Sequence, residues 1–143
     1  YVLAPLDYSS SFQAVECTQP LNEQVYDLQC EIIRKLAAKG SCVMVGRCAD
    51  YVLKDQTECL NVFIYAEKED RIKRIAQRYD LSERKAADKI KRIDRERKSY
   101  YEFHTGSDWG SIEAHQMLLN VSKLGVEGTV DVLEAICRRK MKE

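Results

Sequence analysis

The 143-residue sequence has few residues that break regular structure, with two prolines and six glycines. No run approaches eighteen uninterrupted apolar residues, so a membrane-spanning helix is not expected. The first residues lack the basic start and the long apolar core of a signal peptide. The length is that of one ordinary domain, and 45% hydrophobic with 32% charged residues is typical of a folded chain in water. We therefore expect a single cytoplasmic domain over residues 1–143.

The sequence also lacks the spacings of a zinc site. None of its six cysteines forms a CxxC pair, and its two histidines, His104 and His115, complete no zinc pattern. Cys30 falls in a helical pattern and Cys42 in an apolar run, which favours reduced, mostly buried thiols over disulfides. No Ser/His/Asp or Cys/His arrangement indicates a nucleophilic enzyme. No metal ligand is predicted.

The net charge is zero, but the cations are unevenly distributed. Residues 71–98 contain 12 Lys/Arg against 5 Asp/Glu, whereas residues 1–70 contain 6 against 11 and residues 99–143 contain 5 against 7. Such a basic block attracts the phosphates of a nucleotide, a nucleic acid or a membrane surface. Charged helical faces are more often simply solvated, and that is the favoured interpretation of the block alone. Two arginine faces near one loop could instead close over a polyphosphate.

Helical and strand-like patterns alternate along the chain. Apolar periodicity predicts helices over residues 21–39, 67–79 and 82–100 and a final helix from about 126 to 136. Apolar runs predict strands over 42–46, 60–65 and 117–121, and residues 1–19 and 102–112 are expected to be irregular. This alternation predicts an α/β fold in which helices cover a parallel sheet.

Arg47 directly follows the first predicted strand. Ligands of open parallel sheets bind beyond the carboxyl ends of the strands. An arginine at that position can hold a phosphate or a carboxylate through two parallel hydrogen bonds. An ion pair with Asp50 that merely closes the loop is an equally good interpretation of the spacing.

Six segments in this order carry a family resemblance: CVMVGRCADYVL (42–53), VFIYA (62–66), RIKRI (71–75), DRERKSYY (94–101), TGSDWG (105–110) and SKLG (122–125). Together they resemble the cytidylate kinase-like family of P-loop nucleoside monophosphate kinases, over residues 20 to about 137. The resemblance implies transfer of the γ-phosphoryl of ATP to CMP or dCMP with Mg²⁺. It also implies a three-layer P-loop fold, with a five-stranded parallel sheet flanked by helices and an arginine-bearing lid at about 71–112. Residues 1–20 are then an irregular segment on the substrate side.

The resemblance also implies roles for individual residues. Arg97 and Arg74 are expected to be catalytic, facing the phosphates, and Arg47 and Asp94 to bind the acceptor. Asp50 joins the acceptor group because it lies three residues after Arg47. Ser122, which follows the last strand, is expected to bind the nucleotide. Arg71 and Arg78 are also assigned to the nucleotide, because they share one face of the predicted helix with Arg74.

Two departures from the family pattern limit these expectations. Val45 stands where cytidylate kinases have an aspartate before the glycine, so a preference for cytosine does not follow. No G-x-x-x-x-G-K-[ST] motif occurs, so the first strand and phosphate loop of the family are expected before residue 1. These residues alone are expected to be inactive.

Two alternatives remain at this stage. One is a non-catalytic nucleotide or nucleic-acid-binding module, although the scarcity of aromatic residues among the 71–98 cations argues against single-strand binding. The other is a kinase that acts on a different small molecule with the same fold. Nucleotides are the expected partners, and nucleic acids and membranes are not; the sequence does not predict the oligomeric state.

Overall fold

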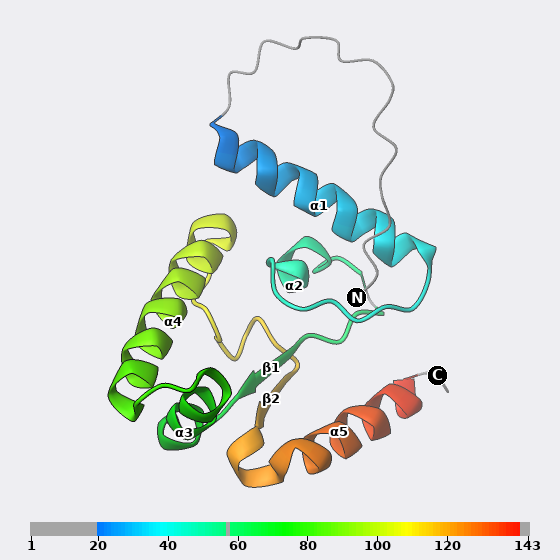
Figure 1. Cartoon of the computed structure of the whole chain (residues 1–143). Coiled ribbons are helices and arrows are strands. Elements are labelled where there is room, and N and C mark those ends of the chain that lie inside the picture. The colour runs from blue at the N-terminus through cyan, green and yellow to red at the C-terminus, as the bar shows by residue number, and fades with distance from the viewer. Residues whose placement is uncertain (1–19, 57, 141–143) are drawn as a thin grey trace.

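The computed structural model describes residues 20–56 and 58–140, which alternate between helix and strand. The elements are α1 (Leu21–Lys39), α2 (Ala49–Val52), β1 (Val62–Tyr65), α3 (Lys68–Tyr79), α4 (Glu83–Thr105), β2 (Met117–Asn120) and α5 (Val121–Lys140). The strands lie at the centre, with α1 and α2 to one side, α5 to the other, and the α3–α4 hairpin beside them (Figure 1). The predicted α/β class is confirmed. Residues 1–19, predicted to be irregular, lie outside the described residues.

The sheet is a parallel pair. β1 pairs with β2 in the register Val62↔Met117 to Tyr65↔Asn120. A parallel pair needs a crossover connection, which α3 and α4 provide. Within the described residues the sheet has these two strands, so the five-stranded, three-layer P-loop arrangement is not reproduced there.

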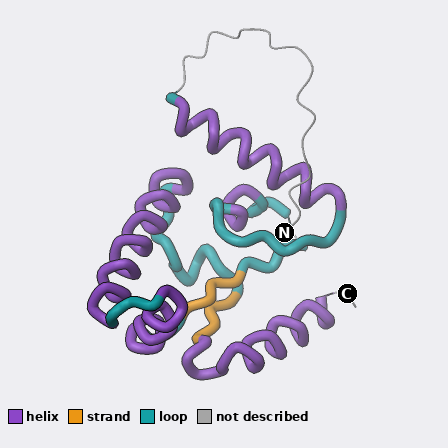
Figure 2. Tube along the Cα trace, viewed as in Figure 1, coloured by secondary structure: helices purple, strands orange, loops and turns teal. Residues whose placement is uncertain are grey.

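The strand predicted over residues 42–46 is wrong. This segment has no regular secondary structure, and it runs as a loop around α2 (Figure 2). Val43 is 94% exposed and Val45 is 91% exposed. An apolar run becomes a strand only where a neighbouring strand accepts its ladder of hydrogen bonds, and no described strand pairs with this one.

The first helix has its predicted bounds but not the expected packing face. Its regular apolar stripe is between 44% and 75% exposed and consists of Leu21, Val25, Leu28, Ile32 and Leu36. The buried residues are Cys30 and Ile33, and Ile33 packs with Ala49 and Leu53 around α2. The apolar periodicity correctly predicted an amphipathic helix. However, the face that packs against α2 is the one with Cys30 and Ile33, on the opposite side from the regular apolar stripe.

Helix α4 extends further than the sequence pattern indicated. Ser82 is the N-cap, at the start of the helix predicted from residue 82, and its hydroxyl oxygen accepts from the Lys85 backbone N–H at 3.4 Å. The helix continues to Thr105 and ends at Gly106, which has a φ of +67° and donates to the Glu102 carbonyl. The expectation of a loop over 102–105 is therefore wrong, because no helix breaker precedes Gly106. One unbroken helix thus joins the 94–97 region to residues 100–105.

The remaining elements anchor the loops. Trp109 contacts Phe63 edge-on at 5.6 Å between ring centroids, which fixes the loop before β2 to the sheet. Helix α5 starts directly after β2, but Gly125, with a φ of +69° and a ψ of 174°, interrupts it, so the helix beyond this kink matches the one predicted from about residue 126. In the described part of the chain no helix is both long and apolar enough to span a bilayer.

The thiols are only partly buried. The five cysteines in the described ranges are all free, as expected for reduced thiols. Cys30 and Cys48 are buried, but Cys42 and Cys137 are exposed. The expectation of mostly packed thiols therefore holds for only some of them.

Candidate functional site

Arg47 lies in a backbone turn of unusual conformation. Gly46, Arg47 and Cys48 all have positive φ angles, of 74°, 57° and 55°. For residues other than glycine, the left-handed conformation costs roughly 1–2 kcal/mol each. The burial of Cys48 and Ala49, which are 3% and 8% exposed, holds the turn in place. Strain of this kind is concentrated at functional sites.

The turn presents the Arg47 side chain on the surface. Its guanidinium carbon lies 5.9 Å from the centroid of the Tyr100 ring, a cation–π arrangement. Burial raises the pKa of Tyr100, while the positive charge of Arg47 acts in the opposite direction. Tyr100 donates to Gln29 Oε1 at 3.0 Å, which fixes its ring. The Arg47–Asp50 ion pair that the spacing also allowed is not formed. No other carboxylate among the described residues forms an ion pair with Arg47 either.

Asp50 is turned toward a different partner. Its Oδ2 atom accepts a hydrogen bond from the Tyr101 hydroxyl at 2.6 Å. His115 Nε2 lies 3.9 Å from the same oxygen, and His115 Nδ1 lies 2.9 Å from the Ser111 carbonyl oxygen. Burial, followed by the hydrogen bond to Asp50, raises the pKa of Tyr101, so its hydroxyl stays protonated at neutral pH. Sequence reasoning assigned no partners to His115 or Tyr101, because they come from separate elements.

The buried Cys48 thiol lies in the same region. Burial raises its pKa to about 11, with the negative charge of Asp50 adding to the effect. The thiol is therefore protonated at neutral pH and packs as a small apolar group. Its burial at 3% exposure supports the turn.

The basic block, residues 71–98, takes part in two ion pairs, Arg71–Asp94 and the longer, more exposed Lys98–Glu102. Arg71 Nη2 donates to both carboxylate oxygens of Asp94, at 2.8 and 2.7 Å, and so links α3 to α4. Arg74, Arg78 and Arg97 are exposed and form no ion pair with the described residues. The structure thus joins Arg71 to Asp94 and leaves Arg74, Arg78 and Arg97 on the surface. The Arg78 guanidinium carbon lies 5.9 Å from the centroid of the Tyr79 ring.

Ser122 lies at the carboxyl end of the strand pair. Its hydroxyl oxygen accepts from the Glu67 backbone N–H at 2.9 Å, and its own N–H donates to Asn120 Oδ1 at 3.0 Å. Asn120 Nδ2 in turn donates to Glu67 Oε1 at 3.0 Å. These bonds join the ends of β1 and β2, which is a structural role that the sequence pattern did not reveal.

A cavity of about 550 Å³ lies between α1, α2 and the end of α4. Its wall includes a parallel stack of Tyr26 on His104, with ring centroids 3.8 Å apart. Burial lowers the pKa of His104, against the pull of Asp27 and Glu23, so the ring is neutral at pH 7. Charged side chains line the same space: Asp27, Glu31, Arg34, Lys54 and Asp55. Sequence analysis missed this cavity because its residues come from three separate elements.

Tyr100 connects the cavity wall to the Arg47 turn. Its ring lies 4.5 Å from the His104 ring and 6.4 Å from the Tyr26 ring, between centroids, and it lies beneath Arg47. Arg47, Asp50 and the cavity therefore form one continuous region on the α1–α2 side. Ser122 and the exposed arginines of α3 belong to other elements and do not contact this region. Within residues 20–56 and 58–140, no three His, Cys, Asp or Glu side chains are grouped for a metal ion.

Comparison with known proteins identifies the family. A family model described as the cytidylate kinase-like family matches residues 3–123. The chain belongs to the cytidylate kinase-like family. The match contains Arg47, Asp50, all the lid arginines and Ser122. The resemblance seen in the sequence is thereby confirmed.

A solved structure with a similar fold supports the arrangement of this cytidylate kinase-like chain. It is the crystal structure of an uncharacterized protein from Eubacterium ventriosum ATCC 27560, with a TM-score of 0.79 and 29% sequence identity. The match covers 84% of this chain and 68% of that chain. No curated protein matches. The neighbour supports the fold, and its description states no activity.

Proposed function

We propose that the protein is a phosphotransferase that moves the γ-phosphoryl group of ATP to a nucleoside monophosphate such as CMP or dCMP. Membership of the cytidylate kinase-like family supports a kinase-like activity. The observation that carries the proposal is Arg47, which is exposed in a strained turn and has no carboxylate partner among the described residues. An exposed guanidinium that is held over a tyrosine ring and has no carboxylate partner among the described residues is suited to binding a phosphate.

The acceptor would lie across Arg47 and the neighbouring cavity. Arg47 would hold the monophosphate, with the Tyr100 ring limiting the orientation of the guanidinium. The nucleoside would occupy the cavity beside Tyr26 and His104, where an aromatic wall and a charged rim suit a polar, planar ring. The neutral state of His104 leaves one ring nitrogen as a hydrogen-bond acceptor and the other as a donor.

The α3–α4 hairpin would supply positive charge to the transferred group. Phosphoryl transfer depends mostly on positioning and charge neutralisation, and it needs no covalent intermediate on the protein. Arg74 and Arg97 are exposed on this hairpin and free of described ion pairs. Its closure over the nucleotides would also exclude water, which otherwise would hydrolyse ATP.

ATP and Mg²⁺ enter the proposal through the family alone. The 143 residues contain no G-x-x-x-x-G-K-[ST] loop, whose backbone and lysine hold the β- and γ-phosphates in P-loop kinases. The described residues likewise offer no cluster of metal ligands. These residues therefore do not fit the donor phosphates or the metal, and the roles derived for them concern the acceptor and charge neutralisation.

A phosphoryl-transfer assay with the natural full-length gene product tests the proposal. CMP, dCMP, UMP, AMP and a shikimate-like acceptor are compared at fixed ATP and Mg²⁺. Arg47→Ala and Arg97→Ala should each lower transfer to the best acceptor by about 100-fold or more with the fold retained. Arg92→Ala is the matched control, since it removes another exposed α4 cation. Wild-type turnover in either site variant would contradict the site assignment, and transfer only to a non-nucleotide would contradict the acceptor class.

A nucleotide-binding module without catalysis is the second candidate, favoured by the exposed cations Arg74, Arg78 and Arg97, which could bind phosphate without transferring it. CMP binding without transfer to any acceptor would support it. A steep loss of RNA or DNA binding between low and high salt would instead indicate a nucleic-acid ligand, because each neutralised phosphate releases counterions.

A further inference from the structure

The Arg47 turn is held from outside by α4, the second helix of the lid. Asp50 lies in α2, three residues after Arg47, and its Oδ2 atom accepts from the Tyr101 hydroxyl of α4 at 2.6 Å. Tyr101 is 7% exposed, and the Asp50 side chain is 19% exposed. A hydrogen bond to a charged acceptor in such a sheltered place is stronger than one on the surface. The bond therefore ties α2, and the turn that precedes it, to α4.

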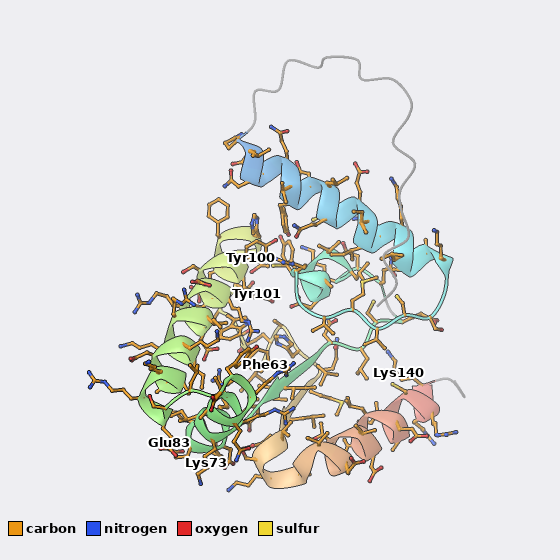
Figure 3. All side chains as sticks on the ribbon, in the orientation of Figure 1. Phe63, Lys73, Glu83, Tyr100, Tyr101 and Lys140 are labelled. Atoms are coloured by element: carbon orange, nitrogen blue, oxygen red, sulfur yellow. The ribbon has the colours of Figure 1, made fainter. Side chains whose placement is uncertain are left out.

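The neighbouring residue reinforces this connection. Tyr100 lies beneath the Arg47 guanidinium, so two consecutive residues of α4 contact the turn region, one at Arg47 and the other at Asp50. Thr105 donates its hydroxyl to the Tyr101 carbonyl oxygen at 2.8 Å, which holds this part of the helix. The labelled Tyr100 and Tyr101 lie toward α1 and α2, whereas Glu83 lies at the opposite end of α4, beside α3 (Figure 3).

The same helix carries the lid residues. Asp94, which is bonded to Arg71 of α3, precedes Tyr101 by seven residues, or about two helical turns. Arg97 lies between them, and the helix has no internal break from Glu83 to Thr105. A tilt of α4 that moves Arg97 must therefore also move Tyr101, and with it the carboxylate of Asp50.

We propose that Tyr101 is a positioning residue that sets the Arg47 turn through Asp50 and couples it to the helix carrying Asp94 and Arg97. Where it concerns acceptor binding, this inference rests on the proposed function. Acceptor bound at Arg47 then favours one orientation of α4. The Tyr101–Asp50 hydrogen bond thereby changes the position of the lid arginines when the acceptor binds. Breaking the hydrogen bond between Tyr101 and Asp50 loosens the turn, although the Arg47 side chain itself is still present.

Hydrogen exchange without any ligand tests the positioning role directly. Tyr101→Phe removes one hydroxyl and keeps the buried ring, so the fold should be retained, as circular dichroism can check. The amides of Ala49, Val52 and Leu53, which donate to the carbonyls of Gly46, Cys48 and Ala49, should exchange about tenfold faster in the variant. Tyr79→Phe is the matched control: its ring is 50% exposed, and its hydroxyl makes no described hydrogen bond. Unchanged exchange in Tyr101→Phe would overturn the proposal.

Two further variants separate the bond from the side chains that form it. Asp50→Asn keeps an oxygen that can accept from Tyr101, whereas Asp50→Ala does not. Asp50→Asn should therefore retain most of the protection that Asp50→Ala loses. The double variant Tyr101→Phe with Asp50→Ala should exchange no faster than Asp50→Ala alone. Additive effects of the two substitutions would show that they act independently.

Measurements with CMP test the coupling. CMP should slow exchange in residues 97–105 of the wild type, and this protection should be lost in Tyr101→Phe. In the transfer assay the variant should raise the KM for CMP about tenfold, because the acceptor-binding turn is loosened, and should change kcat less than threefold, because Arg97 is still present. Equal protection in both proteins would overturn the coupling. If the wild type binds none of CMP, dCMP, UMP and AMP, the proposed function fails, and the ligand-free exchange still decides whether Tyr101 positions the turn.

Discussion

Arg71 on α3 and Asp94 on α4 are joined by one guanidinium nitrogen that donates to both carboxylate oxygens, at 2.8 and 2.7 Å. The sequence pattern assigned these residues to different ligands, one to the nucleotide and one to the acceptor. The structure instead brings them together across the hairpin, 23 positions apart in the chain. Their contact defines the base of the proposed lid.

This pair predicts a measurable coupling between the two helices. The Arg71 side chain is 36% exposed and that of Asp94 is 25% exposed, so solvent screens the attraction only in part. A double-mutant cycle with Arg71→Gln and Asp94→Asn should give a coupling free energy of about 1 kcal/mol in urea unfolding. The Lys98–Glu102 pair, at 3.6 Å and more exposed, is the control and should give about 0.3 kcal/mol. Equal couplings for both pairs would contradict the geometry.

Gly110 should be far less tolerant of alanine than Gly106. A Cβ at Gly110 would lie 2.9 Å from Cζ of Phe63, a ring that also packs against Trp109 and His115. Gly106 has a similar positive φ, but a Cβ there meets nothing within 4 Å. We expect Gly110→Ala to lower the free energy of unfolding by about 3 kcal/mol and Gly106→Ala by about 1 kcal/mol. Chemical denaturation of both variants measures the difference, and similar losses would place Phe63 elsewhere.

Alkaline pH should destabilise the fold through Cys48. Its pKa rises from the usual value near 9 to about 11 in the folded protein. Between these values the folded state binds the thiol proton and the unfolded state has lost it, so raising the pH favours unfolding. Stability should therefore be intact below pH 9 and should fall as the pH rises toward 11. The raised pKa values of Tyr26 and Tyr101 add to the fall above pH 10.

The contribution of the thiol can be isolated with Cys48→Ala. This variant cannot ionise at position 48, so its stability should decline less steeply between pH 9 and 11 than that of the wild type. Urea unfolding at pH 8, 9.5 and 11 gives the comparison. Parallel curves for the two proteins would show that Cys48 is not the group responsible.

The unpaired apolar segment should tolerate polar substitution. Val43 and Val45 are almost fully exposed, so Val43→Thr and Val45→Thr should each change the free energy of unfolding by about 0.5 kcal/mol or less. Ile33 is 8% exposed and packs around α2, so Ile33→Ala should cost about 3 kcal/mol in the same measurement. A large loss for either valine variant would mean that the segment is packed.

Local signals predicted most of the elements. The hydroxyl of Ser82, the glycine after Lys39 and the apolar periodicity of residues 67–79 act within a few residues of their own position. The wrong predictions concern segments whose secondary structure or packing depends on residues far away in the sequence. Residues 42–46 are apolar enough for a strand but have no described strand beside them, and α1 buries Cys30 and Ile33 in place of its regular stripe.

The candidate site divides in the same way. The family, the exposed Arg47 after an apolar run and the basic block at 71–98 could all be inferred from residue types and their order, because motifs are local. The sequence by itself thus determined the α/β class and the family. Only the tertiary structure decided that Arg71 pairs with Asp94, that Asp50 accepts from Tyr101, and that Tyr26 stacks on His104 beside a cavity. Each of these contacts joins residues 23 or more positions apart, and their proximity follows from packing between helices, which no local pattern encodes.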